Sequence, residues 1–380
     1  MKTHYFSIQR FAAVLISLFL VGYLFIVGKP ILAPLLFAAF LAFLLKPAAQ
    51  RLEKWMGSSM WAIIITLFSF LTLLSAIILI FGMQLGEIIG DCGNIQNDLK
   101  VGFTKAFRGI GQFIGVPSSQ IEDYFSNNIS NWATLPADLI TGSIGSSVAV
   151  VGSFFLCILF TFFLLLYRRP FYNFMLYQFS EDDRKKGGVI LRRIEKISKE
   201  YLNGLLLVIV ILAVLNTLGL FIIGIKLALF WGLLGAFLAI IPYVGTFLGG
   251  LLPFIYAVST YGLSWQPLAV IIFYVVVQSL EGNIITPKVI GKSVRINPFI
   301  SVIALLIGGA IWGIAGIVLA LPLIAIVRII FSNIEFLQPV SELLRDDLYK
   351  REDVFENQYD TDAHRLTSFF RAFRSEKRPQ

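Results

Sequence analysis

Long hydrophobic runs separated by polar stretches dominate the pattern of this 380-residue chain. Eight runs can be delimited, over residues 11–28, 30–45, 60–85, 149–167, 204–224, 227–258, 266–286 and 299–332. A helix rising 1.5 Å per residue needs about 20 apolar residues to cross about 30 Å of hydrocarbon. Several runs reach that length without alternating at every second position, so the pattern predicts membrane-spanning helices and excludes a barrel.

Composition supports the same fold class. The chain is 57% hydrophobic and only 14% charged, with a mean hydropathy of +0.81, which is outside the range of a domain that must wet its surface. We therefore predict an all-α integral membrane protein, a polytopic helical bundle of about eight hydrophobic segments. The first run is too long for a signal peptide, so we expect it to remain as a membrane anchor.

Positive charges predict the orientation, because short loops rich in Lys and Arg stay in the cytoplasm. Such loops are residues 46–59 and 168–203, whereas residues 86–148 carry few cations. We expect both termini inside, and the net charge of +8 then reflects orientation rather than nucleic-acid binding. The predicted regions are N-terminal transmembrane helices (1–85), an extracytoplasmic helical cap (86–148), a C-terminal transmembrane transport region (149–335) containing the cytoplasmic loop 168–203, and a solvated cytoplasmic polar tail (336–380).

Two extramembrane stretches have helical periodicity. Residues 95–132 repeat apolar positions as an amphipathic cap would, and we favour packing on the membrane helices over ligand binding there. In the inner loop, an apolar face is opposed by a basic face, which is typical of the lipid headgroup interface. The apolar positions of that loop are Ile190, Ile194, Ile197 and Tyr201.

Signatures of catalysis are missing from the sequence. The two histidines, His4 and His364, lie in the termini, and neither a GxSxG nor an HExxH motif occurs. Gly291-Lys292-Ser293 resembles the end of a phosphate-binding loop, but Thr286 stands where its first glycine should be. We expect no catalytic residue, no metal site, no cofactor, and no disulfide between Cys92 and Cys157.

Two of the hydrophobic runs are too long and too broken for one straight span each. Proline removes a backbone donor and glycine weakens a helix, so such clusters predict kinks or re-entrant hairpins. Two hairpins would also place Lys288, Lys292 and Arg295 in the cytoplasm, and we favour them over eight plain spans. The breaks, which we predict to line a transport pathway, are Pro242, Gly245, Gly249, Gly250 and Pro253 in the first run, Gly313, Gly316 and Pro322 in the second, and Pro287 between the runs.

Polar side chains interrupt the seventh run, in "VVVQSLEGNIITPKVIGKSVRINPF". A carboxylate inside a bilayer costs about 2.5 to 3.5 kcal/mol on insertion scales, so Glu281 should face a partner or a wet cavity. We predict transport or ion coupling for Glu281, Gln278, Asn283, Lys288 and Arg328. The alternative for Glu281 is a structural contact, with Arg328 or with a backbone group at a hairpin tip.

The C-terminal half resembles a known family. "IPYVGTFLGGLLPF", then "QSLEGNIITPKVIGKSVRINPFI", then "GIAGIVLALPLIAI" is similar to the signature of the autoinducer-2 exporter (AI-2E) family, also called the PerM permease family. The resemblance extends over residues 10–335. It implies a bacterial cytoplasmic-membrane protein that is homo-oligomeric. The family's motif residues correspond to Gln278, Glu281, Asn283, Pro287, Lys288 and Pro298.

Three function classes follow. The favoured one is a secondary transporter, either exporting a small solute such as autoinducer-2 or exchanging Na⁺ or Li⁺ for H⁺, as the resemblance implies for different members. A passive channel is the first rival and a membrane scaffold without transport is the second. The partners expected are membrane lipid, a small-molecule or ion substrate and further copies of the chain.

Overall fold

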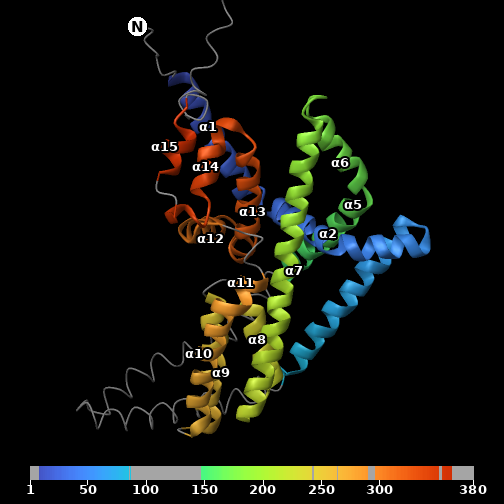
Figure 1. Cartoon of the computed structure of the whole chain (residues 1–380). Helices are drawn as coiled ribbons and strands as arrows, with labels where there is room; N and C mark the ends of the chain where they lie inside the picture. Colours follow the sequence, from blue (N-terminus) through green and yellow to red (C-terminus); the bar gives the residue numbers. More distant parts are fainter. Residues whose placement is uncertain are drawn as a thin grey trace, which may run out of the picture. The chain divides into compact units, whose positions relative to one another are not determined.

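Helices form the architecture of the chain (Figure 1). The computed structural model describes residues 8–84, 86, 147–241, 244–262, 264–289, 296–350 and 353–361. Among these residues every regular element is helical, apart from one isolated β-bridge between Ile296 and Arg345. The labelled helices are α1 (Ile8–Val27), α2 (Lys29–Met56), α5 (Ser147–Leu166), α6 (Arg168–Tyr177), α7 (Arg184–Ile223), α8 (Ala228–Leu238), α9 (Val244–Tyr261), α10 (Trp265–Leu280), α11 (Thr286–Val289), α12 (Pro298–Trp312), α13 (Ile314–Ser332), α14 (Gln338–Leu343) and α15 (Val354–Tyr359); a further helix covers Ser59–Gln84.

Length and hydropathy qualify several of these helices as membrane spans. Five of those described can cross a bilayer alone, and a sixth span forms if α5 and α6, bent by 69° at their junction, count as one. The five are Lys29–Met56, Ser59–Gln84, Arg184–Ile223, Trp265–Val289 and Ile314–Ser332. The fold is therefore that of the predicted all-α, polytopic membrane protein.

The predicted loop 46–59 is largely helical. Helix α2 continues through Lys46 and Pro47 to Met56 and ends where Gly57 adopts the left-handed conformation, with φ of 69°. The N–H of Gly57 donates to the carbonyl of Glu53 at 2.9 Å, which is a helix-ending contact that glycine makes without strain. The hydropathy pattern showed where the apolar run ends, at residue 45, whereas the helix itself ends at Gly57.

Helix α7 joins two segments that the sequence pattern separated. It runs 40 residues from Arg184 to Ile223, about 60 Å at 1.5 Å per residue and roughly twice the hydrocarbon thickness. Its first half contains the basic amphipathic stretch, in which Tyr201 is buried while Arg192 and Arg193 are exposed, as the spacing predicted. One helix thus extends from the apolar span well into a polar environment.

Both long broken runs form pairs of adjacent helices packed on each other. In the first run α8 packs against α9, and in the second α12 packs against α13. At 11 and 15 residues, α8 and α12 are too short to cross about 30 Å alone. The hairpin interpretation therefore describes both runs better than single straight spans do.

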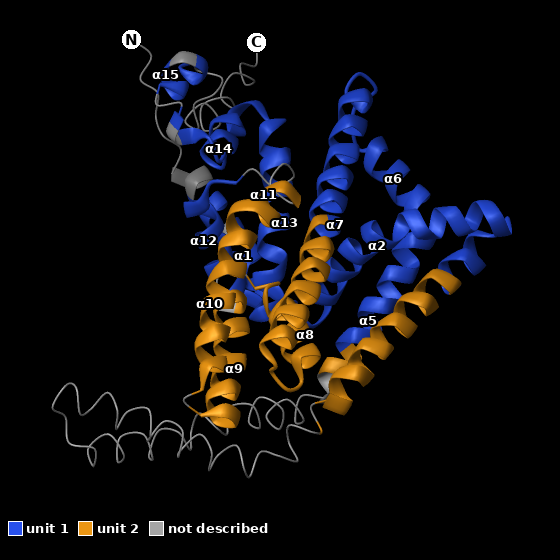
Figure 2. Cartoon of the chain, turned by 60° about the horizontal axis from the view of Figure 1, so that its bottom comes forward, with its two compact units in different colours: residues 1–64, 153–203, 290–380 blue, residues 65–152, 204–289 orange. Residues whose placement is uncertain are grey.

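Two compact units divide the chain, and their segments interleave (Figure 2). Unit 1 comprises residues 1–64, 153–203 and 290–380, and unit 2 comprises residues 65–152 and 204–289. The core of unit 1 gathers side chains of α2, α12 and α13 around Trp312, and that of unit 2 gathers α7, α8, α9 and α10 around Trp231. The four regions predicted from the sequence (1–85, 86–148, 149–335 and 336–380) were defined by their expected roles and not by compactness. They stay predictions.

The beginning of the predicted solvated tail is packed. Helix α14 lies against α13, with Ser341 and Glu342 buried. The hydroxyl of Ser341 donates to the carbonyl of Arg328 at 3.1 Å. The N–H of Asn297 donates to the carbonyl of Leu344 at 2.9 Å, which ties this segment to the residue before α12. The predicted cap, 86–148, lies outside the described residues.

Candidate functional site

The polar motif of the seventh run opens a widened helical turn. Helix α10 ends at Leu280, residues Glu281–Ile285 form a single π turn, and α11 begins at Thr286. The N–H of Thr286 donates to the carbonyl of Glu281, five residues back. Pro287 has no N–H for the carbonyl of Asn283, so one α-helical hydrogen bond is missing here. Single π turns of this kind occur frequently at functional sites.

Glu281 begins the π turn and is half-buried. No described residue forms an ion pair with its carboxylate. The other charged side chains in the described part of unit 2, Lys226 and Lys288, are both exposed. Within the described part of unit 2, the Glu281 carboxylate is thus the one acidic group.

Two amides flank the carboxylate. Gln278 and Asn283 are exposed, and the Asn283 amide nitrogen donates to the carbonyl of Ser279 at 2.9 Å. That bond satisfies one donor of Asn283 and leaves its carbonyl oxygen as an acceptor. Gln278 precedes Glu281 by three residues and therefore lies on the same side of the helix. At Gly282 an added Cβ would meet no atom within 4 Å, so this side of the turn is open.

The predicted breaks of α9 serve close packing. A Cβ on Gly245 would overlap the carbonyl of Leu238, and one on Gly249 would lie 3.0 Å from the Cα of Gly235. Gly250 faces the ring of Tyr274, and Pro253 is fully buried. These positions let α8 and α10 approach α9, which is a structural role. The predicted role of these residues in lining a transport pathway would come in addition and stays a prediction. Pro242 lies outside the described residues.

The remaining predicted residues belong to unit 1. Gly313 separates α12 from α13 with φ of 64° and ψ of −138°, and Gly316 and Pro322 are buried in α13. Arg328 is half-buried near the charged groups Glu342, Arg345, Asp346 and Arg193. Acidic neighbours are thus available to Arg328 within its own unit, and its pairing with Glu281 of unit 2 stays a prediction.

Sequence reasoning missed a set of buried polar atoms in unit 2. Among the described residues they have no hydrogen-bond partner and belong to Gln84, Asn216, Thr217, Trp231, Gln266 and Tyr274. The string Asn216-Thr217 within the apolar run 204–224 was a visible signal, because two polar side chains there break the pattern of the span.

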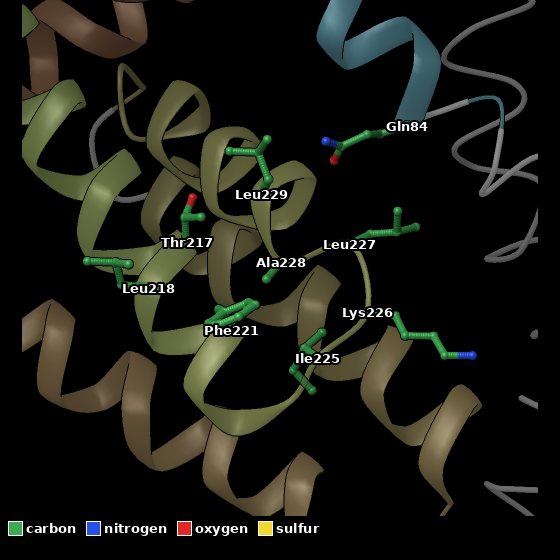
Figure 3. Close-up of a pocket in the computed structure, with 9 residues that line it drawn as sticks. All are labelled: Gln84, Thr217, Leu218, Phe221, Ile225, Lys226, Leu227, Ala228 and Leu229. Carbon is green, nitrogen blue, oxygen red and sulfur yellow. The ribbon is translucent and has the colours of Figure 1, made fainter.

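A cavity of about 660 Å³ lies beside this set in unit 2. Figure 3 shows Thr217, Leu218 and Phe221 projecting from α7, with Gln84 and Lys226 among the other lining residues. The lining is mostly apolar, and its polar members are Gln84, Thr217 and Lys226. In the described part of the chain no group of three His, Cys, Asp or Glu side chains could hold a metal ion.

Comparison with known proteins gives the context of this arrangement. The family model described as AI-2E family transporter matches residues 13–336. The chain is similar to YueF of Bacillus subtilis (strain 168), 29% identical over 88% of this chain and 94% of YueF. It is also similar to the AI-2 transport protein TqsA of Escherichia coli (strain K12), 24% identical over 83% and 90%. YrrI of Bacillus subtilis (strain 168) is 33% identical over 40% of this chain and 42% of YrrI.

Proposed function

Because this chain belongs to the AI-2E transporter family, we propose that it is a secondary transporter exporting a small solute such as autoinducer-2. The observation that carries the proposal is the π turn at Glu281, which interrupts a 25-residue apolar span with a carboxylate and open amides. Single π turns occur frequently at functional sites, and ionisable groups inside a span mark solute or ion pathways. We assign no catalytic reaction to the protein.

We place the protein in the bacterial inner membrane with both termini in the cytoplasm, which the distribution of Lys and Arg supports. We also propose a homo-oligomer assembled through the N-terminal helices. Apolar side chains exposed along α1 and Ser59–Gln84, such as Phe19, Phe68 and Leu79, support contact with lipid or further copies. A monomeric mass in mild detergent and in native membranes would argue against the oligomer.

A second candidate function is the exchange of Na⁺ or Li⁺ for H⁺. Glu281 favours it, because a half-buried carboxylate without an ion pair in the described residues can take up either a proton or a cation. The two functions differ in the species that crosses the membrane: the exporter moves an organic solute, and the antiporter moves Na⁺ or Li⁺ against H⁺.

Purified protein in liposomes tests both functions. Autoinducer-2 uptake is measured under an imposed pH or Na⁺ gradient, and internal pH is followed when Na⁺ or Li⁺ is added. Gradient-driven solute flux supports the exporter, and cation-dependent proton movement supports the antiporter. Flux that persists without a gradient and saturates weakly indicates a channel, and no flux of any kind indicates a scaffold.

The substitution Glu281→Gln separates function from structure. It keeps the side-chain shape and deletes the charge, so a coupling role predicts normal expression and thermal stability with loss of gradient-driven flux. A structural pair with Arg328 predicts poor expression instead, since stranding a buried charge costs about 3 to 5 kcal/mol, with rescue by the added change Arg328→Gln. Glu335→Gln, at an exposed glutamate, is the control. A folded Glu281→Gln protein with wild-type flux and pH dependence would remove Glu281 from the mechanism.

A further inference from the structure

A cavity lies where two spans of unit 2 end. The cavity of about 660 Å³ in Figure 3 is lined by Gln84 and by residues around the turn from α7 to α8. Gln84 is the last residue of the span Ser59–Gln84, and the span formed by α7 ends at Ile223. A span ends where the hydrocarbon meets the lipid headgroups. The cavity therefore lies at the level of the headgroups, beside both helix ends.

The lining of the cavity is mostly apolar and faces outward. Its aromatic member, Phe221, is 72% exposed, and Leu218 and Leu229 are exposed as well. Along a span, outward-facing side chains of this kind meet the acyl chains of lipids. The volume is in the range of sites that hold one small molecule, so the cavity suits a single acyl chain.

The turn between α7 and α8 holds a lysine at this cavity. The N–H of Lys226 donates to the Tyr261 hydroxyl, and that hydroxyl donates to the Gly224 carbonyl, both at 2.9 Å. Leu227 then adopts the left-handed conformation, with φ of 58°, as no other described residue except glycine does. Strained backbone of this kind persists where the surrounding contacts fix it, frequently at ligand sites. The turn therefore fixes the point from which the Lys226 side chain extends.

Lys226 gives the mouth of the cavity a positive charge. No described residue forms an ion pair with its ammonium group. Figure 3 shows the side chain extending outward from the apolar residues, and lysines at the ends of spans place their ammonium among the headgroups in this way. A phosphate group at the mouth would complement that charge.

Two buried polar atoms define the rest of the ligand. Oε1 of Gln84 and the hydroxyl oxygen of Thr217 have no hydrogen-bond partner among the described residues, and both residues line the cavity. The threonine hydroxyl can donate to an ester carbonyl, whereas the Gln84 oxygen needs a donor such as a hydroxyl or an ammonium group. We infer that the cavity binds a phospholipid, with one acyl chain against Phe221 and its apolar neighbours, the phosphate on Lys226, and a headgroup donor on Gln84.

The chemistry of the headgroup separates this ligand from its rivals. A free phosphate compound would use Lys226 but leave the apolar lining uncovered. Phosphatidylcholine has the phosphate and the acyl chains but no donor for Gln84, whereas phosphatidylglycerol and phosphatidylethanolamine provide all three parts. The site does not depend on the proposed transport function, because lipid binding requires no solute to cross the membrane.

Lipid binding to the full chain in detergent tests the inference. Native mass spectrometry follows the adducts formed with phosphatidylglycerol, phosphatidylethanolamine and phosphatidylcholine of identical acyl chains, with glycerol 3-phosphate as the probe without acyl chains. We expect saturable binding of one phosphatidylglycerol or phosphatidylethanolamine per chain, weaker binding of phosphatidylcholine and none of glycerol 3-phosphate. Equal binding of all three lipids, or binding of glycerol 3-phosphate as tight as that of the lipids, would overturn the inference.

Substitutions in the lining locate the bound lipid. In Lys226→Gln and in Thr217→Val the dissociation constant for phosphatidylglycerol should rise about fivefold or more, and in Leu218→Trp the larger ring should fill the cavity and exclude the lipid. The lipid-free thermal midpoint should stay unchanged in Lys226→Gln, and stay unchanged or rise in Thr217→Val, which loses an unsatisfied hydroxyl. Lys185→Gln, at an exposed lysine outside the lining, is the matched control and should bind like wild type. Wild-type affinity in Lys226→Gln or in Leu218→Trp, or an equal loss in the control, overturns the inference.

Discussion

Unit 1 and unit 2 treat their polar groups in opposite ways. In the described part of the chain every ion pair lies in unit 1, including those of Lys46 with Glu195, Arg168 with Glu53 and Arg345 with Glu342. Six of the eight described residues with buried, unsatisfied side-chain polar atoms lie in unit 2. A fully satisfied polar network rigidifies its surroundings, whereas an unsatisfied buried polar group is costly. We propose that unit 1 is the frame and that unit 2 contains the binding part.

The two hairpins repeat this contrast. In unit 1 the indole N–H of Trp312 donates to the carbonyl of Phe25 at 2.8 Å, and the two rings stack with centroids 5.6 Å apart. In unit 2 the indole of Trp231 packs on Tyr256, with centroids 5.1 Å apart, but its N–H has no partner among the described residues. In both hairpins the two helices meet at glycines, Gly308 and Gly316 in unit 1 and Gly235 and Gly249 in unit 2. The hairpins therefore differ mainly in whether their polar atoms have hydrogen-bond partners.

The glycine contact of the unit 1 hairpin should give the largest effect. In Gly308→Ala the new Cβ would lie 2.5 Å from the Gly316 carbonyl oxygen, so the helices must separate, and we expect a loss of about 3 kcal/mol or more. Gly249→Ala, with its closest contact at 3.0 Å, should lose less. Thermal midpoints in detergent measure both. Gly22→Ala, which meets nothing within 4 Å, should behave like wild type. Equal effects of the first two changes would contradict the closer contact at Gly308 than at Gly249.

An ion pair of unit 1 should give the next effect. Glu53→Gln removes the partner of Arg168, whose side chain is only 12% exposed, and we expect a loss of about 1 to 3 kcal/mol in unfolding free energy. The matched change in unit 2 is Lys226→Gln, at an exposed side chain, which should stay within about 0.5 kcal/mol. Denaturant unfolding in detergent measures the pair. A larger loss for Lys226→Gln would reverse the comparison.

The two indoles should give the smallest effect. Trp312→Phe and Trp231→Phe remove the same volume, so their difference isolates the N–H group. The first loses a hydrogen bond and the second loses an unsatisfied donor, and we expect Trp312→Phe to be less stable by about 1 kcal/mol. Thermal midpoints measured side by side provide the test. If Trp231→Phe proves the less stable of the two, its N–H has a partner that accounts for it.

Sequence patterns predicted the candidate site unevenly. Glu281 and Pro287 were identified because a carboxylate and a proline are conspicuous in an apolar run, but the π turn between them depends on which backbone bonds form. Asn216 and Tyr274 were missed: the adjacent pair Asn216-Thr217 was visible in the run 204–224, but a single tyrosine in a span is unremarkable. Both side chains lie near Gly235, at 3.2 and 3.4 Å from a Cβ built there. Periodicity along the chain cannot predict that residues 58 positions apart lie near the same glycine.

By itself, the sequence determined that the chain lies in a lipid bilayer and that its secondary structure is helical. A chain that is 57% hydrophobic must bury its backbone polar groups in helices when it enters a bilayer, and clusters of glycine and proline decide where those helices break. Tertiary structure alone decided which glycines touch, that α7 is one continuous helix, and that buried polar atoms collect in unit 2. Those outcomes depend on the distances between side chains of different helices, and such distances are set only when the helices pack.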